Sequence, residues 1–435
     1  MKKISTFQII VTGVFIFFIV AGVISFAGLG GLGGGGSVGN VVIWGTYDDN
    51  TINEFIFRLS NDDPRFDTVT YVEKDSRTFD ADLVEALASG DGPDVFLLQQ
   101  ETVLRHKDKI FPIPYSTLSE RDFKDKFIEE GELFLSSDGV VGLPLTVDPM
   151  VLYWNRDHYS QAGLSRPPKF WDELLSLTHQ DILTTRGESG AIIRSAFALG
   201  EYQNIAHAKN ILSMLILQAG GSIVNKDSTT GVVSSGLQRR LSDGQSPTEN
   251  ALRFYTDFAN PAKSVYTWNR ALPESREAFS SGVLSNYIGF ASELGAIRKQ
   301  NANLNFDVAP VPQVRNAGTS ITYGNMTALA VSETSKNIAG ALQIVFALVS
   351  DSALQEIATA VNESSVSRAV LSERSSDPFK VIFNDSALQS RGWLDPESEE
   401  TNRIFKTMIE AVVSGRLRVN ESVNTADSAL QNLLR

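Results

Sequence analysis

Cysteine is absent from the 435-residue sequence, and histidine occurs only four times. The lack of cysteine excludes disulfide bonds, thiol catalysis, cysteine-bound zinc and a lipid anchor of the bacterial lipoprotein type. The histidines His106, His158, His179 and His207 are scattered and form no H-x-x-x-H spacing. We therefore predict no metal site and no cofactor.

Signatures of common enzymes are also missing. The sequence has neither a G-x-S-x-G nucleophile elbow nor a G-x-x-x-x-G-K-[ST] phosphate loop. A pair of glycosidase carboxylates could still exist among the 51 acidic residues, because such pairs are defined by distance in space. We predict that the protein is not an enzyme, with an anchored glycoside hydrolase as the alternative.

The chain has no excess of positive charge. Lysine and arginine number 38 against 51 acidic residues, for a net charge of −13, and the basic residues are spread along the chain. We therefore expect no nucleic-acid partner. The composition is globular, with 42% hydrophobic and 20% charged residues, and the length favours two or more lobes.

The amino terminus contains the one long uncharged run, the 23 residues from Phe7 to Leu29. At 1.5 Å per residue this length predicts a helix that spans a membrane, with Lys2 and Lys3 in the cytoplasm. We expect a single-pass anchor at 1–29 in the cell membrane and a soluble part on the extracytoplasmic side. A cleaved signal peptide stays open as the alternative, because small residues occur at Ser25 and Ala27.

A glycine-rich segment, 30–40, follows the predicted anchor. It overlaps a G-x-G-x-x-G match at Gly28, Gly30 and Gly33. A dinucleotide site needs this motif between a strand and a helix, whereas here it precedes the first strand. We interpret the segment as a flexible linker.

Strands and helices alternate after the linker. Strands are predicted at Val41–Gly45, Thr68–Lys74 and Gly92–Leu98, with helices at Ile52–Ser60 and Thr78–Ser89. This order predicts a parallel sheet covered by helices, and ligands collect at the carboxyl ends of such strands. The residues just beyond those ends are Thr46, Tyr47 and Asp48, and Gln99, Gln100 and Glu101.

The pattern then changes twice along the chain. A hairpin is predicted at Ser136–Leu145, and the following region is mostly helical. Strand character returns at Asn305–Gln313 and Met326–Glu333, before a helix at Ser335–Asp351 and a helical tail. A chain that crosses between two halves more than once favours a two-lobed clamp that closes about short hinges.

Seven segments resemble, in the same order, the extracellular solute-binding proteins of ABC importers, in the sugar-binding branch that includes the maltose-binding protein. Together they cover most of Val41 to Trp393, and the block from Gly142 to Leu174 is the most telling. The segments are WGTYDDNTINEFI, GDGPDVFLLQQ, GLPLTVDPMVLYWNRDHYSQAGLSRPPKFWDEL, AFALGEYQN with QAGGSIV, SREAFSSGVLSNYIGFASELGAIR, NFDVAPVPQ and GNMTALAVSETSKNIAGALQIVFALVSD.

The resemblance implies an α/β fold of the periplasmic-binding-protein type II, a two-lobed clamp. Its expected lobes are 41–145 with 292–350, and 146–291 with 351–435. It implies a monomeric receptor that captures a small polar ligand, a sugar or oligosaccharide, and delivers it to the permease subunits of an ABC transporter. A receptor for another polar solute is the alternative within this class.

Carrying the family's cleft residues over by position gives the expected binding site. Sugars need flat aromatic surfaces and planar hydrogen-bonding side chains, and the expected set supplies both. It comprises Thr46, Tyr47, Gln99, Gln100, Asp148, Tyr153, Asn204, Trp268, Tyr287, Glu293 and Trp393.

The other tryptophans, Trp44, Trp154 and Trp171, are assigned to packing. The chain departs from many family members at Ala291–Leu294, where they have a tryptophan. If Trp268 and Trp393 contact ligand, alanine at either position should weaken binding and leave the melting temperature nearly unchanged.

Overall fold

A computed structural model describes residues 38–179, 181–227 and 230–435. The predicted membrane helix and nearly all of the linker lie outside these residues. Within them no single helix has the length and hydropathy of a membrane span. The helices Ile338–Leu348 (α12) and Asp351–Ala360 (α13) reach that hydropathy only together, and they are bent by 77°.

The first lobe begins with a parallel sheet, as predicted. Strand β1 (Val41–Gly45) lies between β2 (Val69–Glu73) and β3 (Val95–Gln99), and both pairings are parallel. The connecting helices are α2 (Asp49–Asp62) and α3 (Phe79–Ser89). The carboxyl ends of β1 and β3 therefore open at the same edge of the sheet.

Local sequence sets the bounds of these two helices. The Asp48 carboxylate accepts the N–H of Thr51 at 2.9 Å and starts α2. Gly90 ends α3 with φ +80°, a left-handed conformation that glycine adopts without strain.

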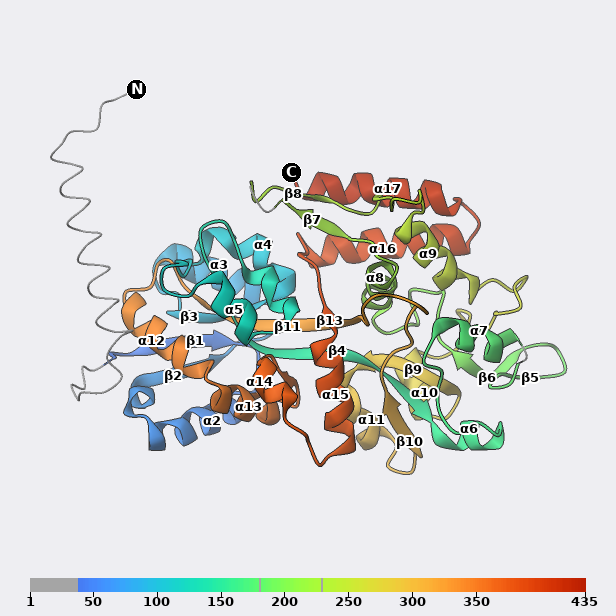
Figure 1. The fold of residues 1–435 in the computed structure, drawn as a ribbon, viewed down its shortest axis with the longest axis horizontal. Helices are drawn as coiled ribbons and strands as arrows, with labels where there is room; N and C mark the ends of the chain where they lie inside the picture. The colour runs from blue at the N-terminus through green and yellow to red at the C-terminus, as the bar shows by residue number, and fades with distance from the viewer. Residues whose placement is uncertain (1–37, 180, 228–229) are drawn as a thin grey trace, which may run out of the picture.

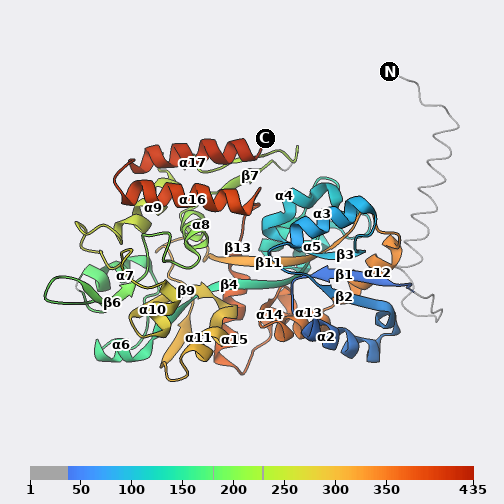
Figure 2. The same ribbon diagram turned by 180° about the vertical axis from the view of Figure 1, so that it is seen from behind.

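Helices cover both faces of this sheet, with α3 and α5 on one side and α2, α13 and α14 on the other (Figures 1 and 2). The remaining elements of the first lobe are η1 (Pro64–Thr68), η2 (Gln100–Thr102), α4 (Val103–His106), η3 (Lys107–Lys109), α5 (Glu120–Lys126), η4 (Glu129–Phe134), α12, α13, β12 (Ser364–Ser365) and α14 (Arg368–Ser372). The predicted hairpin is present as a turn at Asp138–Gly139, closed by a bridge between Leu135 and Val140.

Two antiparallel strands connect the lobes side by side. Strand β4 (Leu143–Asn155) and strand β11 (Thr322–Val331) pair with Asp148 opposite Asn325. The core changes along each strand, because residues up to Val147 pack in the first lobe and residues from Met150 in the second. Figure 1 shows both strands running from one half of the molecule to the other.

The second lobe has a sheet of its own around the far half of β4. Its strands run in the order β10, β4, β9, β6, β5. The strands are β5 (Thr185–Arg186), β6 (Ile192–Phe197), β9 (Leu284–Phe290) and β10 (Phe306–Ala309), with β7 (Val224–Lys226) and β8 (Val233–Ser235) in a separate hairpin. The helices are α6 (Arg156–Gln161), α7 (Trp171–His179), α8 (Ala208–Gln218), α9 (Pro247–Asp257), α10 (Ser275–Ser280), α11 (Leu294–Gln300), α16 (Ser398–Val413) and α17 (Val419–Leu433).

The places where the chain changes lobe differ from the expected boundaries at 291/292 and 350/351. Ile297 and Val308 still pack in the second core, and the chain returns to the first lobe only within β11. Helix α13 and Val366 remain in the first core, so the final return comes through α15 (Pro378–Leu388) and β13 (Ser390–Arg391). Helix α15 places Phe383 against the second core and Ala387 in the first.

Candidate functional site

Polar side chains from both lobes meet where the strands cross. Asp148 lies at the crossing point of β4 and is only 8% exposed. Its Oδ1 accepts the backbone N–H of Ser292, from the second lobe, at 3.0 Å. Burial and then the nearby Glu363 raise the pKa of Asp148 well above its ordinary value.

The first-lobe side of this cluster is a chain of hydrogen bonds that begins at Tyr47, just beyond β1. The Tyr47 hydroxyl and the Thr146 Oγ1 are 2.7 Å apart, and the same hydroxyl donates to the Glu363 carboxylate at 3.1 Å. Burial raises the pKa of Glu363. Burial and the Glu363 charge also raise the pKa of Tyr47, so the phenol stays protonated and can donate.

The second-lobe side is built around Glu293, which follows β9. Its carboxylate accepts the Tyr287 hydroxyl at 2.7 Å and the Phe290 N–H at 2.8 Å, and it lies 2.8 Å from the His207 Nε2. Burial alone would raise the pKa of Glu293, but these hydrogen bonds outweigh burial and lower it. Glu293 is therefore a charged hydrogen-bond acceptor, whereas the raised pKa of Asp148 favours its protonated, neutral form.

The predicted aromatic residues lie in a different environment. Trp268 is 0% exposed, and its Nε1 donates to the Asn204 Oδ1 at 3.1 Å. Tyr153 is also fully buried, stacks on Tyr287 with ring centres 5.9 Å apart, and donates to the Phe290 carbonyl at 2.7 Å. In this conformation Tyr153 packs behind the end of β9 beside Glu293, whereas Trp268 lies in the core of the second lobe. The contact of both residues with a ligand stays a prediction.

The remaining predicted residues follow the strand ends of the first lobe. Gln100 is buried and donates to the Gly324 carbonyl at 2.7 Å, so it ties the end of β3 to the crossing strand β11. Gln99 is exposed, and Thr46 is half-buried. Trp393 is buried beside Phe405 in the second lobe. It takes no part in the hydrogen bonds around Asp148.

The lobes also touch at the edge where β3 ends. The Ser398 hydroxyl, at the start of α16, donates to the Glu101 carboxylate at 3.1 Å. Arg105 pairs with Glu397 at 3.2 Å and with Asp80, in its own lobe, at 2.9 Å. These contacts hold the two lobes together in the present conformation.

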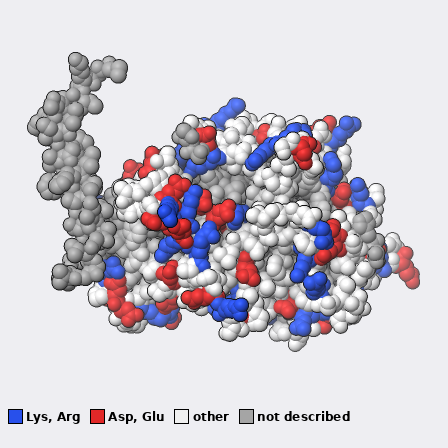
Figure 3. Space-filling view, in the orientation of Figure 1, with Lys and Arg blue, Asp and Glu red and all other residues white. Residues whose placement is uncertain are grey.

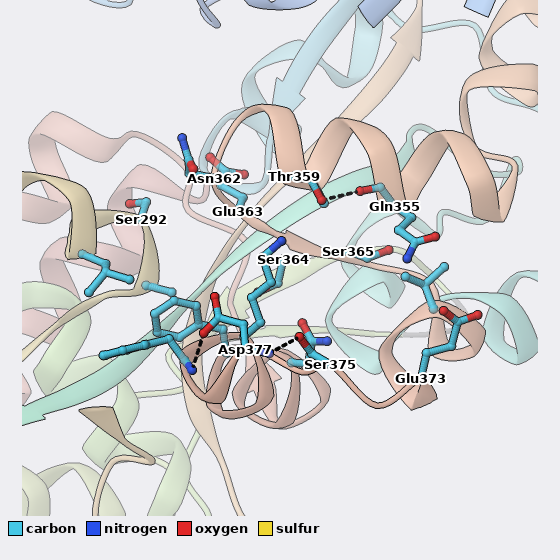
Figure 4. Close-up of a pocket in the computed structure, with 18 of the residues that line it drawn as sticks. Ser292, Gln355, Thr359, Asn362, Glu363, Ser364, Ser365, Glu373, Ser375 and Asp377 are labelled. Carbon is cyan, nitrogen blue, oxygen red and sulfur yellow. Dashed lines mark hydrogen bonds between the residues drawn. The ribbon is translucent and has the colours of Figure 1, made fainter. Parts of the chain in front are cut away.

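A cavity of about 470 Å³ opens beside Ser292 and Glu363 (Figure 4). Ser292 and Glu363 belong to both the cluster and the cavity wall, and Asn362, Thr359 and Gln355 continue the polar lining along α13. Helices α13 and α14 of the first lobe and α11 and α15 near the second form the walls. This arrangement can hydrogen-bond a polar molecule from both lobes at once.

Two members of the cluster were not expected from the sequence. His207 begins α8 with φ +60° in a segment that has no motif, and Glu363 lies in a polar loop after α13. The left-handed backbone turns the imidazole of His207 toward Glu293. Only the spatial proximity to Tyr47 and Asp148 distinguishes Glu363 from the other acidic residues. No group of three or more metal-ligating side chains occurs among the residues that the structure describes.

The sequence model of the bacterial extracellular solute-binding proteins matches residues 66–354. The chain belongs to this family. A binding protein of Brucella abortus strain 2308 is 24% identical over 259 residues, which is 59% of this chain. The match spans 58% of the length of that relative.

Solved structures of the family share the two-lobed α/β fold. The cyclic α-maltosyl-1,6-maltose binding protein of Arthrobacter globiformis has a TM-score of 0.72 at 15% identity, covering 92% of this chain and 99% of its own. The sugar-binding protein MalE of Xanthomonas citri has 0.71 at 18%, covering 91% and 97%. An ABC transporter solute-binding protein of Thermotoga lettingae bound to α-D-tagatose has 0.63 at 20%, covering 91% and 100%.

Proposed function

We propose that the protein is a membrane-tethered extracytoplasmic receptor that captures a small sugar between its lobes and delivers it to an ABC permease. The observation that carries the proposal is the polar cluster at the crossing strands, to which each lobe contributes hydrogen-bonding groups. A ligand that contacts Tyr47 and Asp148 on one side and Glu293 on the other would favour the closed arrangement. Similar structures bound to tagatose, maltotetraose and mannobiose support a sugar as the ligand.

The charges of the cluster suit an uncharged ligand with hydroxyl groups. Glu293 accepts hydrogen bonds, and the Tyr47 oxygen, whose proton is donated to Glu363, can also accept one, so sugar hydroxyl groups can donate to both lobes. The raised pKa of Asp148 and of Glu363 keeps negative charge low where the lobes cross. The predicted anchor at 1–29 would hold the receptor beside its permease.

A sugar that fills the site is expected to stabilise the full-length protein. At a concentration 100 times its Kd, binding adds about 2.7 kcal/mol to the free energy of unfolding. Tagatose, maltotetraose and mannobiose are tested by thermal shift in a detergent without a sugar head group. Glu293→Gln should weaken the binding of the stabilising sugar by about tenfold or more, because it removes a charged acceptor.

The matched control is Glu54→Gln, which changes an exposed carboxylate of α2 far from the crossing strands. If no sugar in a wider library raises the melting temperature of the wild type, sugar binding is wrong. Consumption of the stabilising sugar would instead favour a hydrolase.

Arg105→Ala is expected to loosen closure without touching the crossing strands. The Arg105–Glu397 pair is partly exposed, and such pairs contribute about 0.2–1 kcal/mol, so sugar affinity should fall by up to about fivefold. Small-angle scattering should report a larger radius of gyration for the ligand-free variant. Arg77→Ala is the control, because Arg77 pairs with Asp75 inside the first lobe. Equal effects of both variants would contradict a role of Arg105 in closure.

A further inference from the structure

Two side chains of the second lobe flank Glu293 and keep much of their surface free. The His207 Nε2 lies 2.8 Å from the Glu293 Oε1, and the Arg276 Nη1 lies 3.6 Å from the Oε2. The side chains of His207 and Arg276 are 29% and 47% exposed, whereas that of Glu293 is 9% exposed. A molecule beside the second lobe can therefore touch the imidazole and the guanidinium more readily than the carboxylate that holds them.

Most of the capacity of Glu293 to accept hydrogen bonds is already used. Its Oε1 accepts from the Phe290 N–H and the His207 ring, and its Oε2 accepts from the Tyr287 hydroxyl. Each carboxylate oxygen has about two acceptor sites, so about one site remains, on Oε2. A sugar carries several hydroxyl groups, and the others need further partners in this lobe.

The backbone and a neighbouring ring fix the orientation of His207. The residue has φ +60° at the start of α8, and its imidazole packs edge-on against Phe290 with ring centres 4.7 Å apart. Because the charged Glu293 can only accept, the Nε2 atom carries the hydrogen. The neutral ring then has an acceptor at Nδ1, and this atom makes no hydrogen bond to the described residues.

Arg276 supplies donors next to this acceptor. It lies on α10, and the charge of Glu293 holds its guanidinium at a distance too long for a hydrogen bond. Its five side-chain N–H groups make no hydrogen bond within the part of the chain that the structure describes, so they are free to bind a ligand. Glu293 thus places an acceptor and a fork of donors on its two oxygens.

The first turn of α8, which begins beside His207, faces the first lobe. Lys209, in this turn, has its Nζ 3.5 Å from the Ser398 hydroxyl. That hydroxyl donates to the Glu101 carboxylate of the first lobe at 3.1 Å. On its other side, the turn reaches Glu293 at the crossing strands through His207. His207 therefore lies between two junctions of the lobes, on the side of the second lobe that a ligand in the cleft would meet.

His207 and Arg276 together discriminate between classes of ligand. A carboxylate or a phosphate would bind the guanidinium but would meet the lone pair of the imidazole and the charge of Glu293, and Arg276 would repel an ammonium ion. Two neighbouring hydroxyl groups suit both side chains, because one can donate to the His207 Nδ1 and the other can accept from Arg276. On the face of the molecule shown in Figure 3, acidic and basic side chains are intermingled, so no large area there attracts ions of one sign.

We propose that His207 and Arg276 bind two hydroxyl groups on neighbouring carbon atoms of the ligand, and so make the receptor specific for a vicinal diol. This inference rests on the proposed function, a receptor for a sugar, and names the part of the sugar that the second lobe recognises. Glu293 holds both side chains and contributes its remaining acceptor site. Sugars that lack either hydroxyl group are bound more weakly.

Monodeoxy sugars test the two contacts one hydroxyl group at a time. Tagatose is the first probe and mannobiose the second, and calorimetry on the full-length protein compares each monodeoxy derivative with its parent sugar. In the wild type, loss of the hydroxyl that donates to His207 should weaken binding about fivefold, and loss of its neighbour, which binds the charged Arg276, about tenfold. His207→Gly should abolish the first difference alone, and Arg276→Ala the second alone.

Controls of the same kind exist elsewhere in the second lobe. Glycine suits the backbone of His207, and Asn316→Gly makes the same change at φ +63° in an exposed loop. Arg315→Ala removes another half-exposed arginine, which pairs with Asp172 at 2.7 Å. Both controls should keep both differences. A purely structural role of His207 would lower the affinity for the parent sugar and for all derivatives equally, so the differences would also persist in His207→Gly.

Three results would overturn the inference while sugar binding itself stands. The first is that both differences persist in His207→Gly and Arg276→Ala. The second is that the two hydroxyl groups identified lie on carbon atoms that are not neighbours. The third is tighter binding of a uronic acid than of the parent sugar, which would mean that the guanidinium takes a carboxylate. If neither probe nor any sugar of the wider library binds the wild type, the proposed function fails, and the inference fails with it.

Discussion

Replacing Trp268 with alanine should lower the free energy of unfolding by about 3–5 kcal/mol. The indole is 0% exposed in the core of the second lobe, and the substitution leaves a large cavity there. It also removes the donor to the Asn204 Oδ1, whose amide otherwise holds the carbonyls of Asn269 and Leu272 at 2.9 and 3.0 Å. Urea-induced unfolding of the full-length protein measures the loss.

Two further variants separate packing from ligand contact. Trp268→Phe keeps most of the buried ring and loses the hydrogen bond, so its effect should be intermediate. Phe57→Ala changes an aromatic that is 66% exposed and should stay within about 0.5 kcal/mol of the wild type. Unchanged stability of Trp268→Ala together with lost sugar binding would instead place the indole at the ligand surface, as the sequence led us to expect.

The first lobe was the easier half to predict. Strands β1 and β2 and helix α3 are short, separated by turn residues, and have clear periodicity, so local sequence was sufficient. Strand β9 gives no such signal, because all seven of its residues are buried and the run LSNYIGF does not alternate. The sequence therefore predicted too few strands in the second lobe, and we expected the region after β4 to be mostly helical.

The lobe boundaries depend on tertiary packing that no local pattern reports. Strand β11 looks uniform in sequence, yet Tyr323 packs in one core and Met326 in the other. The same limit applies to the site. Asp148 and Glu293 were suggested by the resemblance, whereas Glu363 joins them only because the loop after α13 folds back onto β4. The burial of Trp268 and Trp393 could not be deduced from their polar neighbours in the sequence.

Glu130 is a second case in which burial, invisible in the sequence, decides the chemistry. Desolvation is the main cause that raises its pKa, to about 7, from an ordinary value of 4.5. The charged Arg391 and the polar Ser390 and Gln100 act in the opposite direction but do not offset burial. Glu129, Glu132 and Lys226 are the other charged groups around the cavity of about 280 Å³ that Glu130 lines on the side of η4.

This shift predicts a dependence of stability on pH with a definite sign. Between pH 4.5 and about 7 the folded protein keeps the Glu130 proton while the unfolded chain loses it, so stability falls as pH rises through that window. The full effect is about 3 kcal/mol, complete above about pH 7. Glu130→Gln stays neutral, so its unfolding free energy should lack this fall and exceed that of the wild type at pH 8.

Urea-induced unfolding of both proteins at intervals from pH 4 to pH 8 measures the difference, and subtracting the two curves removes the contributions of the other buried acids. Glu132→Gln is the control, because its partly exposed carboxylate pairs with Lys124 at the surface and its curve should run parallel to the wild type. Parallel curves for Glu130→Gln would mean that Glu130 has hydrogen-bond donors in solution. The carboxyl group would then be stabilised in its charged form within the folded protein.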